Sequence, residues 1–149
     1  MKGPGLVAWF GRKKRRITRL LVVEDEPLVA FDAEHMLGDA GYVVVGTVDR
    51  VTEAVRLIGD GASIDLVLVD MNLADGSGMD VAIAARAADV PVIFVTGQRP
   101  SDAMTVAVGC LSKPYLQRDM LAAIDAVDAV LAGREPRRIP AGLTLFPQG

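Results

Sequence analysis

The sequence has little of several residue types, and each scarcity narrows the possibilities. Its 149 residues include a single cysteine, Cys110, which excludes an internal disulfide and fits a reducing compartment such as the cytoplasm. Aromatic side chains make up only 5% of the residues, so alanine, valine and leucine must build the core. No apolar run reaches the ~18 residues that would predict a membrane-spanning helix. The remaining composition, 51% hydrophobic and 23% charged, predicts one globular domain.

Charge is distributed unevenly along the chain. Residues 1–19 carry seven basic side chains and no acidic one, whereas residues 20–133 carry 18 acidic and 6 basic ones. The acidic body argues against direct DNA binding. We interpret residues 1–17 as a flexible basic leader, with contact to a membrane surface or a nucleic acid as the alternative. We interpret residues 134–149 as an irregular C-terminal tail, because they contain several prolines and glycines.

Between residues 18 and 133 short apolar runs alternate with segments of helical periodicity. Apolar runs without alternating polarity indicate strands buried on both faces, as in a parallel sheet covered by helices. The predicted strands are 18–25, 42–48, 64–70, 90–97 and 108–114, and the predicted helices are 27–40, 51–58, 77–88, 102–107 and 116–133. Five such units predict a doubly wound α/β fold of the flavodoxin-like type, with a five-stranded parallel sheet of order 2-1-3-4-5 and helices on both faces.

Polar residues stand where the predicted strands end. The carboxyl ends of parallel strands meet at one edge of a sheet, and ligands bind there in folds of this class. These end residues are Glu24 and Asp25 after the first strand, Asp70 after the third, Thr96 after the fourth and Lys113 after the fifth. We therefore expect their side chains to gather in one site.

The residue types of this predicted site suit phosphoryl transfer. Clustered carboxylates raise one another's pKa and destabilise a protein unless a cation joins them. Mg²⁺ takes a few carboxylate oxygens and several waters, and its open positions accept phosphate oxygens. The central Asp70 is the predicted nucleophile that takes a phosphoryl group, while Lys113 supplies positive charge and Thr96 a hydrogen-bond donor.

Four stretches carry a resemblance to a known family, and they read VVEDE, LVLVDMNLADGSG, IFVTG and SKPY. They resemble the receiver (REC) domain of bacterial two-component response regulators, and the match covers residues 18–133. The resemblance implies that Asp70 is the phosphoacceptor. It also implies that Mg²⁺ is held by Glu24, Asp25, Asp70 and the main-chain carbonyl of Asn72.

The same resemblance implies how a phosphorylated state would be sensed. Thr96 corresponds to the switch hydroxyl and Lys113 to the family's lysine, with a cis peptide bond before Pro114. Gly78, eight residues after Asp70, stands at the usual glycine position.

Partners also follow from the resemblance. The phosphoryl donor would be a histidine kinase or a histidine phosphotransfer protein, and the output would pass to a separate protein effector, because only 16 residues follow Gly133. We interpret the chain as a stand-alone cytoplasmic switch in two-component signal transduction, not as an enzyme with turnover. A homodimer through the fourth and fifth helices is left open.

Some positions depart from the common receiver pattern. Leu73 and Ala74 stand where many receivers have Met-Pro, and Cys110 stands where many have the switch aromatic. These departures, with PVIFVTGQ and KPY, resemble the FAT GUY subfamily. Cys110, together with the short segment after Gly133, also motivates an alternative, a pseudo-receiver that binds partners without phosphorylation. An aspartate-nucleophile phosphohydrolase is disfavoured because it would need an acid at Asn72. A flavin protein is disfavoured because three acids follow the first strand.

Overall fold

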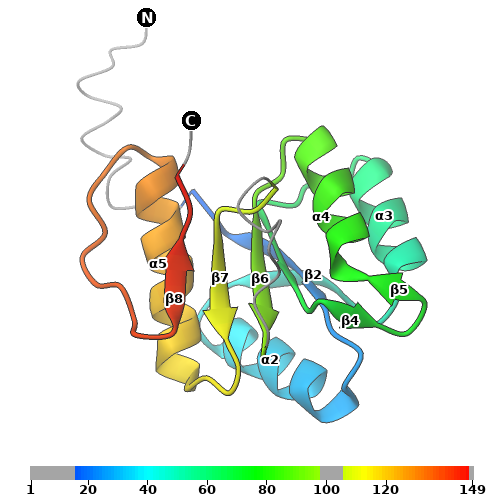
Figure 1. Ribbon diagram of the computed structural model, residues 1–149, viewed down its shortest axis with the longest axis horizontal. Helices are drawn as coiled ribbons and strands as arrows, with labels where there is room; N and C mark the ends of the chain where they lie inside the picture. Colours follow the sequence, from blue (N-terminus) through cyan, green and yellow to red (C-terminus); the bar gives the residue numbers. More distant parts are fainter. Residues whose placement is uncertain (1–15, 98–105, 148–149) are drawn as a thin grey trace, which may run out of the picture.

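The computed structural model describes residues 16–97 and 106–147, and its central feature is a six-stranded sheet with the order β2-β1-β3-β6-β7-β8 (Figure 1). Its strands are β1 (Arg19–Val23), β2 (Val43–Val48), β3 (Leu66–Val69), β6 (Val92–Thr96), β7 (Gly109–Ser112) and β8 (Leu143–Leu145). The first five pair in parallel and reproduce the predicted order 2-1-3-4-5. The predicted α/β fold is confirmed, and its central sheet has one strand more than the five expected.

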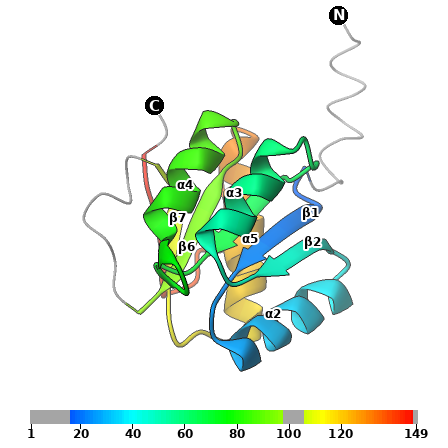
Figure 2. The ribbon, with the colours of Figure 1, turned by 90° about the vertical axis from the view of Figure 1, so that its right-hand side faces the viewer.

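Helices cover both faces of the sheet (Figures 1 and 2). They are α2 (Pro27–Asp39), α3 (Val51–Gly59), α4 (Gly78–Ala87) and α5 (Gln117–Leu131). One core cluster joins α2 and α5 to the sheet through residues that include Leu37, Leu68 and Ile124. A second cluster joins α3 and α4 to the opposite face through residues that include Ala54, Val81 and Phe94. The sheet is therefore buried on both sides, which explains its unbroken apolar strands.

The sequence contains the signals that begin and end the helices next to the site. Pro27 opens α2, where its missing N–H costs no hydrogen bond, and Gly41 follows the helix with a φ of 97° that favours glycine. A short hairpin of β4 (Asn72–Leu73) and β5 (Gly76–Ser77) precedes α4. The Ser77 side chain then accepts a hydrogen bond from the main-chain N–H of Met79 at 3.1 Å, which caps α4.

The strand order places the site. Strand β1 is followed along the chain by β2 on one side and by β3 on the other, so the direction of winding reverses next to β1. A crevice opens at such a reversal outside the carboxyl ends of the strands. The residues that follow β1 and β3 therefore face this crevice from adjacent strands.

The C-terminal tail is not irregular throughout, which corrects the prediction for residues 134–149. Leu143–Leu145 forms β8, which runs antiparallel to β7 and covers its outer edge (Figure 1). Leu143 and Phe146 are buried in the two core clusters. The physical reason is that β7 would otherwise leave its main-chain groups unpaired at the edge of the sheet.

Of the predicted leader, 1–17, the structure describes only residues 16 and 17. Ile17 is buried in the core, so the folded unit begins before the predicted boundary. The rest of the predicted leader, and most of the helix predicted over 102–107, lie outside the described residues. Among the described helices, none combines the length and the apolar character needed to cross a bilayer.

We expect the tail to contribute measurably to stability. Replacing the buried Leu143 by alanine should lower the free energy of unfolding by about 2–4 kcal/mol, since it removes apolar contacts and leaves a cavity. The matched control is Ile139→Ala, because Ile139 lies in the same tail and is exposed, so its loss should cost less than about 0.5 kcal/mol. Urea unfolding of both variants measures the difference. Equal losses would contradict a packed tail.

A buried acid lies on α5, close to the start of the described chain. Asp128 is 5% exposed, and one of its carboxylate oxygens accepts a hydrogen bond from the main-chain N–H of Arg16 at 3.2 Å. The other oxygen, Oδ1, has no hydrogen-bond partner among the described residues. Burial raises the pKa of Asp128, and the hydrogen bond from Arg16 opposes that rise without cancelling it.

This raised pKa predicts a pH dependence with a definite sign. A group whose pKa is higher in the folded state stabilises the fold fully below its ordinary pKa, here 3.8, and this contribution is lost as the pH rises through the folded value. The free energy of unfolding of the wild type, measured relative to Asp128→Asn, should therefore fall as the pH rises above 3.8. Thermal unfolding of both proteins across this range tests the prediction. Parallel stability curves would refute it.

Candidate functional site

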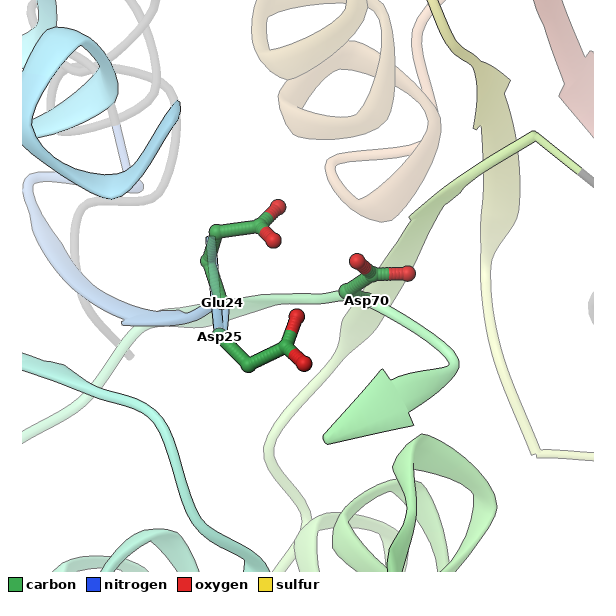
Figure 3. A group of neighbouring side chains, drawn as sticks. All are labelled: Glu24, Asp25 and Asp70. Atoms are coloured by element: carbon green, nitrogen blue, oxygen red, sulfur yellow. The ribbon is translucent and has the colours of Figure 1, made fainter. Parts of the chain in front are cut away.

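Three carboxylates meet beyond the ends of β1 and β3. Glu24 and Asp25 directly follow β1, and Asp70 directly follows β3. Each offers a carboxylate oxygen, and these oxygens lie within 4.8 Å of one another. Figure 3 shows the three carboxylate groups converging on one space. Glu24 and Asp70 are buried at 6% and 7% exposure, so much of their charge is removed from water.

The main chain fixes where these acids stand. The N–H of Glu24 donates to the carbonyl of Val48 at 2.9 Å, and the N–H of Asp70 donates to the carbonyl of Val23 at 2.9 Å. Both bonds continue the sheet pairing one residue past the strands. Because the backbone is held on both sides of the crevice, the carboxylates are positioned before any ligand arrives.

Lys113 joins the acids from the end of β7. Its Nζ lies 2.8 Å from Oε1 of Glu24 and 3.0 Å from Oδ2 of Asp70. Burial lowers the pKa of Lys113, but the hydrogen bonds to Glu24 and Asp70 outweigh burial and raise that pKa above its ordinary value. The lysine is therefore a permanent cation between two buried carboxylates.

The charges in this crevice do not balance. Burial raises the pKa of Glu24, and the nearby charge of Asp70 acts in the same direction, while the hydrogen bond from Lys113 opposes both. One ammonium group faces three carboxylates, so the cluster retains an excess of negative charge. The donor atoms are hard oxygens at a spacing that suits a divalent cation, and the cluster therefore fits Mg²⁺.

Glu26 is a member of the site that the sequence analysis did not include. Its main-chain N–H donates to Oε2 of Glu24 at 3.1 Å, and its own exposed carboxylate lies 3.4 Å from Nζ of Lys113. Glu26 therefore helps orient Glu24 through the backbone. The signal was present in the sequence as the third acid of VVEDE, but Glu26 stands one residue beyond the predicted strand 18–25 and was therefore not counted among the strand-end residues.

Thr96 lies at the end of β6, beside the acid cluster in the strand order. It is 3% exposed, and its carbonyl accepts a hydrogen bond from the main-chain N–H of Lys113 at 3.0 Å. The peptide bond between Lys113 and Pro114 is cis, as the resemblance implied. The structure thus brings the ends of β6 and β7 together, while the signalling role of Thr96 stays a prediction.

Asn72 is placed close to Asp70 by the turn that follows β3. Its main-chain N–H donates to Oδ1 of Asp70 at 3.5 Å, which is long for a hydrogen bond. The side chain of Asn72 is exposed. The predicted use of its carbonyl as a metal ligand remains a prediction.

Gly78 is required by the backbone next to Asp70. Its N–H donates to the carbonyl of Met71 at 2.7 Å, and a Cβ at this position would overlap the main-chain oxygen of Asp70. Only glycine lets α4 begin so close to the acid.

The Gly78→Ala substitution should consequently disturb the site. We expect it to lower the free energy of unfolding by about 1–3 kcal/mol, because the backbone after β3 must move. Gly59→Ala is the control, since a Cβ there meets nothing within 4 Å. Urea unfolding of both variants provides the measurement. If Gly78→Ala were as stable as Gly59→Ala, the backbone at position 78 would have room for a side chain next to the main-chain oxygen of Asp70, contrary to this prediction.

Comparisons with known proteins agree with this geometry. A family model described as the response regulator receiver domain matches residues 20–125. The phyllosphere-induced regulator PhyR of Methylorubrum extorquens is 37% identical over 117 residues, covering 72% of this chain and 42% of PhyR. The cell cycle transcriptional regulator CtrA of Caulobacter vibrioides is 36% identical over 116 residues, covering 73% of this chain and 49% of CtrA. The chain therefore spans about half the length of these curated relatives.

Solved structures show the same likeness. A response regulator receiver protein from Sinorhizobium medicae WSM419 matches with a TM-score of 0.66 and 26% identity, covering 75% of this chain and 94% of that protein. The receiver domain of PhyR from Erythrobacter litoralis matches with a TM-score of 0.61 and 27% identity, covering 74% and 89%. The predictions of FAT GUY membership and of a stand-alone protein are not tested by these matches and stay predictions.

Proposed function

The chain belongs to the family of response regulator receiver domains, and on that basis we propose that Asp70 accepts a phosphoryl group and thereby switches a protein-interaction surface. The observation that carries this proposal is the placement of Asp70 between other carboxylates and Lys113 in a crevice at the strand ends. Such an arrangement suits the transfer of a group that carries negatively charged oxygens.

The proposed transfer is a displacement at phosphorus. A carboxylate oxygen of Asp70 forms a new P–O bond with the phosphoryl group of a phosphohistidine, and the P–N bond to the donor imidazole breaks with its electron pair leaving on nitrogen. The ammonium of Lys113, already 3.0 Å from Asp70, offsets negative charge on the phosphoryl oxygens. Mg²⁺, when held by Glu24, Asp25, Asp70 and the carbonyl of Asn72, would supply further positive charge at the same oxygens.

The switch itself would act through Thr96. Its hydroxyl is the proposed hydrogen-bond donor to the phosphoryl group, and its buried position at the end of β6 ties any movement to the strand. Phosphorylation would then bias an existing equilibrium between two conformations of this region. The protein would be a switch with a single phosphoacceptor, not an enzyme with turnover.

A surface suited to the phosphoryl donor lies beside the site. A groove of about 460 Å³ between α2 and the start of α5 is lined by residues that include Met36, Pro114, Tyr115 and Lys113 itself. Leu28, which precedes the groove residue Val29 on α2, is 78% exposed. We propose that a histidine kinase or histidine phosphotransfer protein docks here in the cytoplasm, because an apolar contact at this place brings its phosphohistidine toward Asp70.

A pseudo-receiver that works without phosphorylation is the alternative. Its support is the small Cys110 at the position where many receivers have the switch aromatic. Against it stand the buried Glu24 and Asp70 with their shared lysine, an arrangement that a pure binding module does not need.

The proposal predicts a single, site-specific modification. Incubation with Mg²⁺ and acetyl phosphate should add one phosphoryl group to the wild type, measured by intact mass, and the gain should disappear in Asp70→Asn and without Mg²⁺. The matched control is Asp80→Asn, because Asp80 is an exposed acid on the adjoining helix α4 and its loss should leave the gain intact. An equal gain in Asp70→Asn, or no gain with either acetyl phosphate or phosphoramidate, would contradict the proposal.

A further inference from the structure

The C-terminal segment 140–147 lies on the edge of β7 as a docked strand. Strand β8 pairs with β7 in register, with Leu145 opposite Gly109, Thr144 opposite Cys110 and Leu143 opposite Leu111. Two further hydrogen bonds extend the pairing at both ends of β7. The N–H of Phe146 donates to the carbonyl of Val108 at 2.8 Å, and the N–H of Ser112 donates to the carbonyl of Gly142 at 3.0 Å.

Strand β7 is shaped to receive this segment. A Cβ at Gly109 would lie 2.8 Å from the main-chain oxygen of Thr144, and the next two nearest atoms belong to Leu143 and Leu145. All three nearest atoms therefore come from the C-terminal segment. A side chain at position 109 would push the segment away, so the glycine is specific to a docked tail.

The segment also contributes a large ring to the core. Phe146 is 5% exposed and belongs to the same cluster as Cys110 and Phe94. A small side chain on β7 is thus combined with an aromatic side chain from the tail. The core around β7 is completed by residues that lie beyond α5 in the sequence.

A continuous path of pairing connects the segment to the acid cluster. Thr144 pairs with Cys110, Cys110 with Phe94, and Phe94 with Val69, the residue before Asp70. A second link is shorter. The N–H of Ser112 donates to the carbonyl of Gly142 in the segment, and Ser112 directly precedes Lys113 in the sequence. The segment and the site therefore share the carboxyl end of β7.

We propose that docking of segment 140–147 on β7 is coupled to phosphorylation of Asp70, so that each favours the other. The inference rests on the proposed function. Its physical reason is that both events order the same short piece of chain, Leu111 to Pro114. A phosphoryl group bound by Lys113 fixes this piece from the crevice, and the segment fixes it from the edge of the sheet. If the segment is already docked, phosphorylation has less conformational entropy of this piece to remove, and the converse also holds. The two events therefore favour each other.

The test is amide hydrogen exchange at Phe146 and Ser112, the two donors that join β7 to the segment. We expect exchange at both amides to become at least about fivefold slower when Mg²⁺ and excess acetyl phosphate keep the protein phosphorylated, with the phosphorylated fraction read by intact mass in the same sample. Asp70→Asn under the same conditions should show no slowing. A wild type without phosphoryl gain would overturn the proposed function and this inference with it. Phosphoryl gain with unchanged or faster exchange would overturn this inference alone.

Variants test the reverse direction of the coupling. Gly109→Val should displace the segment, and it should speed the loss of the phosphoryl group after donor removal by at least about fivefold relative to Gly59→Ala. Phe146→Ala should act in the same direction, with exposed Ile139→Ala as its control. Circular dichroism verifies that each variant is folded. A folded Gly109→Val protein with fast exchange at Phe146, yet with phosphoryl loss at the control rate, would refute the coupling.

Discussion

The pairing of Lys113 with Glu24 and Asp70 is the interaction on which the rest of the site depends. Two carboxylates can be buried side by side only because an ammonium group lies 2.8 and 3.0 Å from them. The three residues come from the ends of β1, β3 and β7, which meet only in a parallel sheet of this order. The fold therefore holds together charges that would repel one another or remain in water in an open chain. One ammonium group does not balance two carboxylates, and Asp25 adds further negative charge to the cluster.

The shortage of positive charge in this cluster links the fold to the proposed phosphoryl transfer. A cluster in which positive and negative charges were equal would act as a structural salt bridge. A cluster with excess negative charge favours the binding of a ligand that brings positive charge. Gly78 lets α4 start directly beside Asp70, and the backbone bonds of Glu24 and Asp70 keep both acids in place. The site is thus preorganised by the sheet in a chain that belongs to the response regulator receiver family.

The parallel sheet and the meeting of Glu24, Asp25, Asp70 and Lys113 at its edge could be predicted because each depends on local pattern. Apolar runs such as LVLV of β3 indicate burial on both faces, and the parallel arrangement then fixes where Asp70 must lie. Strand β8 could not be predicted, because LTL is short and becomes a strand only by pairing with an edge far away in the sequence. Glu26 was missed for another reason, since it stands one residue beyond the end predicted for the first strand and its exposed carboxylate still lies 3.4 Å from Nζ of Lys113.

The claim that the acid cluster accepts a divalent cation beside Lys113 can be checked by the melting temperature as a function of Mg²⁺ concentration at constant ionic strength. We expect a saturable rise for the wild type, equivalent to about 2.7 kcal/mol of stabilisation at a hundredfold excess of Mg²⁺ over its dissociation constant. Asp25→Asn should show a much weaker rise, because it removes one of the three clustered carboxylates. A wild-type melting temperature that does not change with Mg²⁺ would contradict the claim.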